Sequence, residues 1–349
     1  LEAGFETAGR PLVVLVHGFP DLAYGWRGVM PLLAAAGYHV VAADQRGYGR
    51  SGGTEATYET ALEPYSTLNK VRDVVELVSA LGYSSVAAVV GHDSGSPIAG
   101  WCALIRPDVF RSVVLMSAPF GGAPALGGER SEAPRASGLD AELAKLEPAR
   151  KHYQAYYSTR EANENMWHAP QGVHAFLRAY FHFKSADWAG NQPHVLEGVT
   201  AAELGKLPTY YVMQLDEGMA ETVAAEMPSE AAIAGCAWLP EDELAVFSGE
   251  YERTGFQGGL QAYRWGTSGL GGAELSLFAG RTIDVPSCFV SGASDWGNYQ
   301  SPGALERMDE RACTDFRGVH FVEGAGHWVQ QEQAEVVSAL LLKFLGEVG

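Results

Sequence analysis

Basic residues are few in this sequence: 24 Lys and Arg stand against 42 Asp and Glu in 349 residues, a formal net charge of −18. Negative charge of this size is repelled by phosphate backbones and anionic membrane surfaces, and no cluster of basic residues offsets it locally. These features argue against a nucleic-acid partner. No apolar run approaches the roughly 20 residues that span a bilayer, so we expect no membrane-spanning segment.

Cysteine is also scarce, and no Cys-x-x-Cys pair joins Cys102, Cys236, Cys288 and Cys313. Their separation indicates neither a zinc cluster nor a disulfide framework, and the scattered histidines lack the spacing of metal ligands. We therefore expect free thiols in a reducing compartment, and no metal. The N-terminus has no charged segment followed by an apolar one, so the expected location is cytoplasmic. The sequence is compatible with a homodimer.

What the sequence does contain is a regular alternation of buried strands and amphipathic helices. Apolar, β-branched runs predict strands at 11–16, 38–43, 86–90, within 109–116, at 285–290 and at 319–322. Helical spacing of apolar residues is found at 67–81, 97–105 and 332–344. Strands that alternate with helices predict an α/β fold with a mostly parallel central sheet flanked by helices.

The alternation stops at about residue 122. From 122 to 276 the chain is rich in Ala, Glu, Tyr, Trp and His and shows helical patterns, including one over 210–226, without strand alternation. We therefore predict a core made of residues 1–121 and 277–349, interrupted by an inserted helical lid domain over residues 122–276.

The most informative segment is Gly91-His92-Asp93-Ser94-Gly95, which directly follows a predicted strand. A reactive side chain on a sharp strand-to-helix turn needs small residues two positions before and after it, because the backbone passes close to itself there. Gly91 and Gly95 meet this condition around Asp93, whereas a turn centred on Ser94 would place His92 at one flank. The candidate nucleophile is therefore a carboxylate, Asp93.

Two further residues follow later strands of the predicted sheet. Asp295 comes a few residues after the 285–290 strand, and His327 ends a Gly-Ala-Gly-His turn after the 319–322 strand. Functional groups gather at the carboxyl ends of strands in open α/β sheets. Asp284 precedes its strand and should lie at the opposite edge. The chain order nucleophile, acid, histidine then predicts Asp295 as the acid and His327 as the base.

A candidate oxyanion hole completes this set. Phe19 lies in the loop after the first strand, where its backbone N–H can converge with that of Ser94, the residue after the nucleophile. Two such amides would stabilise the oxyanion of a tetrahedral intermediate.

These motifs, with His17-Gly18-Phe19-Pro20, make the chain similar over nearly its whole length to the α/β-hydrolase superfamily, and within it to the epoxide hydrolases. Members of that family bind the epoxide oxygen with two lid tyrosines. In the segment 208–221, alignment on Gly218 selects Tyr210 by this resemblance, and in the segment 255–264 the pattern selects Tyr263.

The resemblance implies a reaction without a cofactor, in which Asp93 forms an ester with a neutral epoxide and water activated by His327 releases a vicinal diol. One departure bears on pocket size: many members carry an aromatic residue where this chain has Ser94. The same serine weakens a haloalkane dehalogenase reading, which calls for Trp there, and a fluoroacetate dehalogenase reading, which calls for Arg. These carboxylate-nucleophile hydrolases stay open as alternatives, as does a non-catalytic ligand-binding protein of the same fold.

Overall fold

The core of the molecule is a seven-stranded sheet of strand order β1-β3-β2-β4-β5-β8-β9, seen in a computed structural model that describes residues 1–127 and 136–349. The strands are β1 (Glu2–Ala3), β2 (Leu12–Val16), β3 (His39–Ala42), β4 (Ala88–His92), β5 (Val113–Met116), β8 (Ser287–Gly292) and β9 (Phe316–Val322). Within this sheet, as described, β1 pairs antiparallel with β3 and the other neighbouring strands pair parallel. The mostly parallel sheet predicted from the apolar runs is confirmed, and the short edge strand β1 is an addition.

Helices cover both faces of this sheet because alternate side chains of each strand point to opposite sides. Leu12 and Val14 of β2 pack in a cluster with α2 (Thr67–Ala80) and α3 (Gly95–Ile105). Val13 and Leu15 pack on the other side, in a cluster that includes α1 and α16. The remaining core helices are α1 (Met30–Ala35), α14 (Ala304–Arg307), α15 (Val329–Glu332) and α16 (Ala334–Val348), with helical turns at Ala23–Trp26, Glu63–Tyr65, Ser276–Phe278, Trp296–Asn298 and Met308–Ala312.

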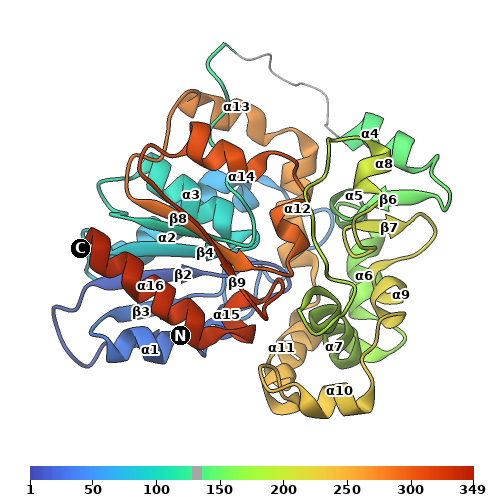
Figure 1. The fold of residues 1–349 in the computed structure, drawn as a ribbon, viewed down its shortest axis with the longest axis horizontal. Helices are drawn as coiled ribbons and strands as arrows, with labels where there is room; N and C mark the ends of the chain where they lie inside the picture. The colour runs from blue at the N-terminus through green and yellow to red at the C-terminus, as the bar shows by residue number, and fades with distance from the viewer. Residues whose placement is uncertain (128–135) are drawn as a thin grey trace.

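The lid is built mainly of helices, and Figure 1 shows it beside the sheet, with α12 between the two and both chain termini on the core side. Its helices are α4 (Ala136–Leu143), α5 (Tyr153–Tyr157), α6 (Glu161–Trp167), α7 (Gly172–Lys184), α8 (Ala201–Leu204), α9 (Met219–Ala224), α10 (Glu230–Gly235), α11 (Glu241–Thr254), α12 (Gln257–Ser268) and α13 (Gly271–Leu275). Leu275 packs against the core cluster around α2 and α3, so the chain returns to the core shortly before residue 277.

The lid also contains a strand pair, which corrects the expectation of helix throughout 210–226. Strands β6 (Arg150–His152) and β7 (Val212–Gln214) pair antiparallel, and helix α9 begins only at Met219. The residues Val212 and Met213 are fully buried, so the strand places two adjacent apolar side chains in the lid core. A three-residue strand is too short to produce a visible alternation in sequence.

Aromatic side chains join the lid to the core. The ring of Phe19, in the loop after β2, lies 5.3 Å from that of Tyr157 on α5. The ring of Trp328, next to the candidate base, lies 4.5 Å from that of Phe181 on α7. Both core aromatics belong to the same apolar cluster as the lid. The lid therefore packs directly over the loops at the carboxyl ends of the strands.

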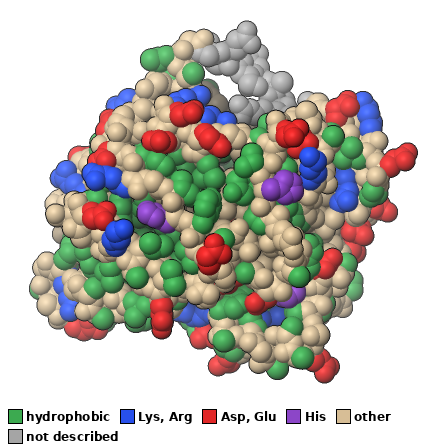
Figure 2. All heavy atoms as spheres, viewed as in Figure 1, with side chains coloured by type: hydrophobic (Ala, Val, Ile, Leu, Met, Phe, Trp, Pro, Cys, Tyr) green, Lys and Arg blue, Asp and Glu red, His purple; other side chains and the backbone are tan. Residues whose placement is uncertain are grey.

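Charges on the visible face of the molecule are mixed. Figure 2 shows Lys and Arg side chains scattered among Asp and Glu, and the described part of this face carries no continuous basic patch. No helix within 1–127 or 136–349 combines the length and the apolarity that a bilayer crossing requires.

Candidate active site

Asp93 occupies the sharp turn between β4 and α3. Its φ of 52° lies in the left-handed region, which non-glycine residues rarely adopt without a functional reason. The two flanking glycines explain how the turn closes. A Cβ on Gly91 would lie 2.2 Å from the carbonyl oxygen of Gly95, and a Cβ on Gly95 would lie 2.4 Å from that of Val16. The strain is therefore imposed by close backbone contacts on both sides of the carboxylate.

The Asp93 carboxylate is held from two directions. The backbone N–H of Phe19 donates to Oδ1 at 2.9 Å, and His327 Nε2 lies 3.3 Å from Oδ2. The Ser94 amide makes no hydrogen bond to this carboxylate among the described residues, so its role in an oxyanion hole stays a prediction. If Oδ2 formed an ester, Oδ1 would become its carbonyl oxygen, and the Phe19 amide is already placed to donate to that oxygen.

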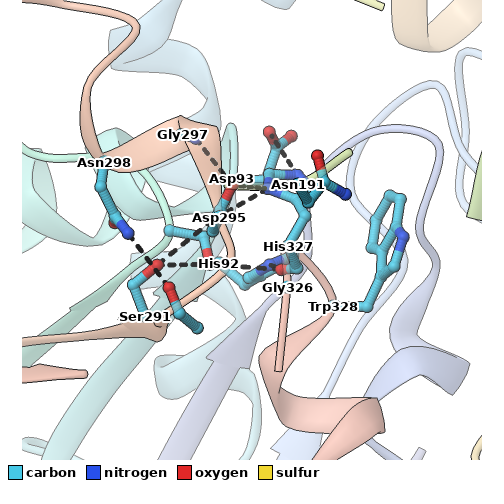
Figure 3. Close-up of polar contacts among 12 residues, drawn as sticks. His92, Asp93, Asn191, Ser291, Asp295, Gly297, Asn298, Gly326, His327 and Trp328 are labelled. Atoms are coloured by element: carbon cyan, nitrogen blue, oxygen red, sulfur yellow. Dashed lines mark hydrogen bonds and ion pairs between the residues drawn. The ribbon is translucent and has the colours of Figure 1, made fainter. Parts of the chain in front are cut away.

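His327 is joined to Asp93 and to Asp295, as Figure 3 shows. Its Nδ1 lies 3.1 Å from Asp295 Oδ2 and 3.2 Å from Oδ1. Asp295 follows β8 and is fixed in turn by the amide of Gly297, which donates to Oδ1 at 2.7 Å, and by the hydroxyl of Ser291, which donates to Oδ2 at 3.2 Å. The structure thus brings together the three residues that the strand-end argument selected.

Electrostatics keep both carboxylates ionised. Burial alone would raise the pKa of Asp93, but the hydrogen bond and charge of His327, with the charge of Lys184, hold that pKa well below its usual range. Burial likewise opposes ionisation of Asp295, and again His327 outweighs it and lowers the pKa. An ionised carboxylate on a strained turn is a nucleophile, whereas a protonated one is not.

The loop that carries His327 docks on the end of lid helix α7. The backbone N–H of His327 donates to the carbonyl of Lys184 at 2.9 Å. The carboxylate of Glu332, on α15, accepts three backbone N–H groups: Ala186 of the lid at 2.8 Å, and Gly326 and Trp328 at 2.9 Å. Position 326 must be glycine, because a Cβ there would lie 2.5 Å from the backbone of the segment after α7.

A second buried network supports the same loop from the core side. The His92 ring nitrogen Nε2 lies 2.7 Å from the carbonyl oxygen of His327. Gln330 Nε2 lies 3.2 Å from the other ring nitrogen of His92 and donates to Asp21 Oδ2 at 3.1 Å. Burial raises the pKa of Asp21 to about 7 and lowers that of His92 to about 3. Sequence reasoning did not single out Asp21, since one acidic residue in a loop carries no pattern.

Tyr210 is not placed where the sequence analysis expected it. Its hydroxyl donates to Asn191 Oδ1 at 2.7 Å, and the charge of Asp93 is not among the causes that raise its pKa. Asn191, which appears in Figure 3, is itself fixed because its Nδ2 donates to two backbone carbonyls. The Tyr210 hydroxyl is therefore committed to a hydrogen bond in the lid interior.

Tyr153 and Tyr263 lie together instead. Their ring centroids are 6.0 Å apart, and the Phe19 ring lies 5.5 Å from that of Tyr263. Burial raises the pKa of both phenols, and in each the negative charge of Asp93 is the next cause. Gln154 Nε2 donates to the Tyr153 oxygen at 3.1 Å, which leaves the Tyr153 proton available to a ligand. The charge of Asp93 also acts on Tyr48, Tyr180 and Tyr211, and what distinguishes Tyr153 and Tyr263 is that they pack together beside Phe19, whose amide binds Asp93.

Similarity to known proteins in sequence and structure shows which family the chain belongs to. A family model described as alpha/beta hydrolase fold matches residues 11–190. The chain is 34% identical to epoxide hydrolase B of Mycobacterium tuberculosis (strain ATCC 25618 / H37Rv), over 96% of this chain and 91% of that protein. The chain belongs to the epoxide hydrolases, within the α/β-hydrolase fold. The crystal structure of epoxide hydrolase A from Mycobacterium thermoresistibile superposes on this epoxide hydrolase with a TM-score of 0.76 at 32% identity, covering 99% of this chain and 93% of that one. Potato (Solanum tuberosum) epoxide hydrolase I gives a TM-score of 0.74 at 27% identity, covering 99% and 94%.

The strand pair of the lid brings Tyr153 next to the segment that contains Tyr210 in this epoxide hydrolase. Because β6 pairs with β7, the residues that end the pair meet: the Tyr153 N–H donates to the Tyr211 carbonyl at 2.9 Å, and their rings lie 5.3 Å apart. Tyr210 itself lies in the turn before β7, one residue from Tyr211. The signal that points to Tyr153 is the run of three tyrosines within 153–157.

Proposed function

We propose that this epoxide hydrolase converts a neutral epoxide to a vicinal diol through a covalent ester on Asp93. The observation that carries the proposal is the position of the Asp93 carboxylate, with one oxygen on the Phe19 amide and the other 3.3 Å from His327. A carboxylate nucleophile with a histidine beside it favours ester formation followed by hydrolysis.

In the first step, Oδ2 of Asp93 attacks an epoxide carbon while Oδ1 keeps its hydrogen bond to Phe19. The ring C–O bond breaks, and the oxygen that leaves takes a proton from one of two phenols. We assign these to Tyr153 and Tyr263, because the Tyr263 ring packs on Phe19, whose amide binds Asp93, and the Tyr153 ring lies beside that of Tyr263. The charge of Asp93 acts on both phenols. Tyr153 replaces Tyr210, the residue expected from the sequence. A phenol that donates to a developing alkoxide lowers the barrier most in a site sheltered from water.

In the second step, His327 takes a proton from water, which attacks the carbonyl carbon of the ester. The tetrahedral oxyanion forms on the former Oδ1, where the Phe19 amide, and by prediction that of Ser94, stabilise it. Asp295 fixes the imidazole and stabilises the imidazolium that forms. The ester C–O bond then breaks, the released alkoxide takes the second proton of the attacking water, and the diol leaves. His327 returns its proton to the phenolate left by the first step, and Asp93 carries the oxygen that came from water. Protein groups and water are the only participants proposed, and no cofactor enters.

The route of the oxygen atom tests this mechanism. In a single turnover in isotopically labelled water, the label should enter the Asp93 carboxylate and not the diol, as read by mass spectrometry of the active-site peptide. Label in the first diol formed would show direct attack by water and would exclude the ester.

A His327→Gln variant gives a second, independent test. It should still open the epoxide but accumulate the ester on Asp93, because no base activates the hydrolytic water. Normal diol release by this variant would remove His327 from the mechanism. A parallel assay of haloalkanes for halide release separates the dehalogenase alternative, which predicts halide and no diol.

Other expectations from the sequence stay proposals. They are the division into a core of residues 1–121 and 277–349 and a lid of 122–276, a cytoplasmic location, and a homodimer. Epoxide and water as reactants follow from the family.

A further inference from the structure

Lys184, the last residue of α7, is a buried cation in the lid. Only 3% of its surface is exposed, although lysine is one of the residues least often buried. Its Nζ lies 4.8 Å from the ring centroid of Tyr211, 5.5 Å from Tyr210, 5.6 Å from Tyr180 and 5.7 Å from Trp328. Each ring face attracts the ammonium, so four aromatic rings replace part of the hydration that burial removes.

The ammonium lies over the ring of Trp328, the residue next to His327, and interacts electrostatically with the catalytic carboxylates. Burial lowers the pKa of Lys184, and the charges of Asp93 and Asp295 act in the opposite direction. In return, the charge of Lys184 contributes to the lowered pKa of each carboxylate and opposes protonation of His327. The cation therefore acts on all three members of the triad.

The backbone fixes this arrangement. The carbonyl of Lys184 accepts the His327 N–H at 2.9 Å, and Gly326 allows the two segments to touch. The carboxylate of Glu332 binds backbone amides on both sides of the same contact. The lysine and the histidine thus keep a constant relation as long as the lid is docked.

A positive charge at this place favours the unprotonated form of His327, which the second step requires. His327 lies between two carboxylates, 3.1 Å from Asp295 and 3.3 Å from Asp93, and both favour its protonated form. A protonated imidazole cannot accept a proton from water. When Asp93 becomes an ester its charge disappears, and the charges left facing the ring are Asp295 and Lys184.

The other titratable groups around His327 leave this balance in place. His92, on β4, stays neutral because burial lowers its pKa to about 3. Glu332, on α15, contacts the backbone of the loop rather than the ring. Burial raises its pKa to about 7, so it titrates within the pH range of the test below, and the comparison of Lys184 variants at each pH separates its effect, which all of them share.

We propose that Lys184 is a positioning residue for the hydrolytic step: its caged ammonium offsets the charge of Asp295 in the ester and keeps His327 able to accept the proton of water. This inference rests on the function proposed above. The same charge stabilises the ionised Asp93 before attack, so its removal does not make this carboxylate a weaker nucleophile. Removal of the lysine should therefore slow ester hydrolysis without slowing ester formation.

The test compares Lys184→Met with the wild type in single-turnover rapid-quench experiments from pH 5 to pH 9, which follow the ester and the diol separately. In the variant, ester formation should stay within about threefold of the wild type. The acidic limb of ester hydrolysis should move up by about one pH unit, which is about tenfold slower hydrolysis below that limb. Hydrolysis should recover at high pH.

Two further variants complete the test. Lys184→Arg keeps the charge and should keep the wild-type limb. Lys151→Met is the matched control, because Lys151 Nζ also sits over a ring, that of Tyr156 at 4.7 Å, but the charges that act on it belong to residues outside the triad. It should change neither step.

Several outcomes would overturn the inference. They are an unmoved acidic limb in Lys184→Met, an equal loss at every pH, or a loss confined to ester formation. If Lys184→Met does not fold, Lys184→Gln carries the same comparison against Lys184→Arg. The proposed function fails separately, since its failure means that the wild type forms no ester on Asp93 at all.

Discussion

Two tyrosine-to-phenylalanine variants should separate chemistry from stability in the lid. Tyr153→Phe removes a phenol that faces Asp93, and Tyr210→Phe removes one that hydrogen-bonds Asn191. A hydrogen bond to a charged group contributes about 1.5–3 kcal/mol. If the Tyr153 bond forms fully only as the alkoxide develops, its loss slows ester formation by about 10-fold to 150-fold. The Tm should change little, because Tyr153 donates to no other described residue.

Tyr210→Phe should show the opposite pattern. Its loss leaves the buried Oδ1 of Asn191 without a donor, which costs about 1–3 kcal/mol of stability. The Tm should fall by a few degrees while the rate of ester formation stays within about threefold.

The assay measures the stopped-flow rate of ester formation and the calorimetric Tm for both variants. Tyr38→Phe serves as the control, since Tyr38 packs against the apolar cluster around α1 and α16. If Tyr210→Phe slowed ester formation tenfold or more and Tyr153→Phe did not, the assignment of the lid phenols would be refuted.

Two further predictions concern the elbow and the buried Asp21. Gly95→Ala should reduce activity at least a hundredfold and lower the Tm, because its Cβ would lie 2.4 Å from the Val16 carbonyl oxygen. Gly249→Ala, in open space on α11, should instead add about 0.5–1 kcal/mol to the free energy of unfolding. Equal Tm values for the two variants would contradict this. Since the pKa of Asp21 is raised from 3.8 to about 7, its carboxyl holds a proton in the folded state that the unfolded chain releases, and the contribution of Asp21 to stability falls as pH rises from about 4 to 7. Asp21→Asn should remove up to about 4 kcal/mol of that fall, and identical pH slopes in urea unfolding would refute the assignment.

The sequence was sufficient where short-range geometry decides the structure. Gly91 is required by a contact within the turn itself, and Gly95 by the close approach of the end of β2, the neighbouring strand of the sheet. Because every such strand-to-helix turn is this tight, their spacing around Asp93 could be interpreted without knowledge of the lid. Asp295 and His327 could be located because the ends of parallel strands meet at one edge of the sheet, whatever the lid does.

Residues of the lid were beyond such reasoning because their positions depend on contacts between distant segments. Tyr153 and Tyr211 meet only through a three-residue strand pair. Lys184 ends a helix that has an ordinary amphipathic pattern, and a lysine there reads as exposed. Its burial comes from rings that lie about 26 and 144 residues further along the chain, which no local pattern encodes.

The contact between the end of α7 and the His327 loop has a consequence for synthesis of the protein. The ribosome releases Asp93 and the lid long before residues 326–332, whose amides and carboxylate hold the lid in place. Nascent chains emerge in order from the N-terminus. Until His327 and Trp328 have emerged, the aromatic rings of the lid lack their partner Trp328, and the nucleophile has no base. During translation the nucleophile Asp93 is thus made well before His327, the base that regenerates it.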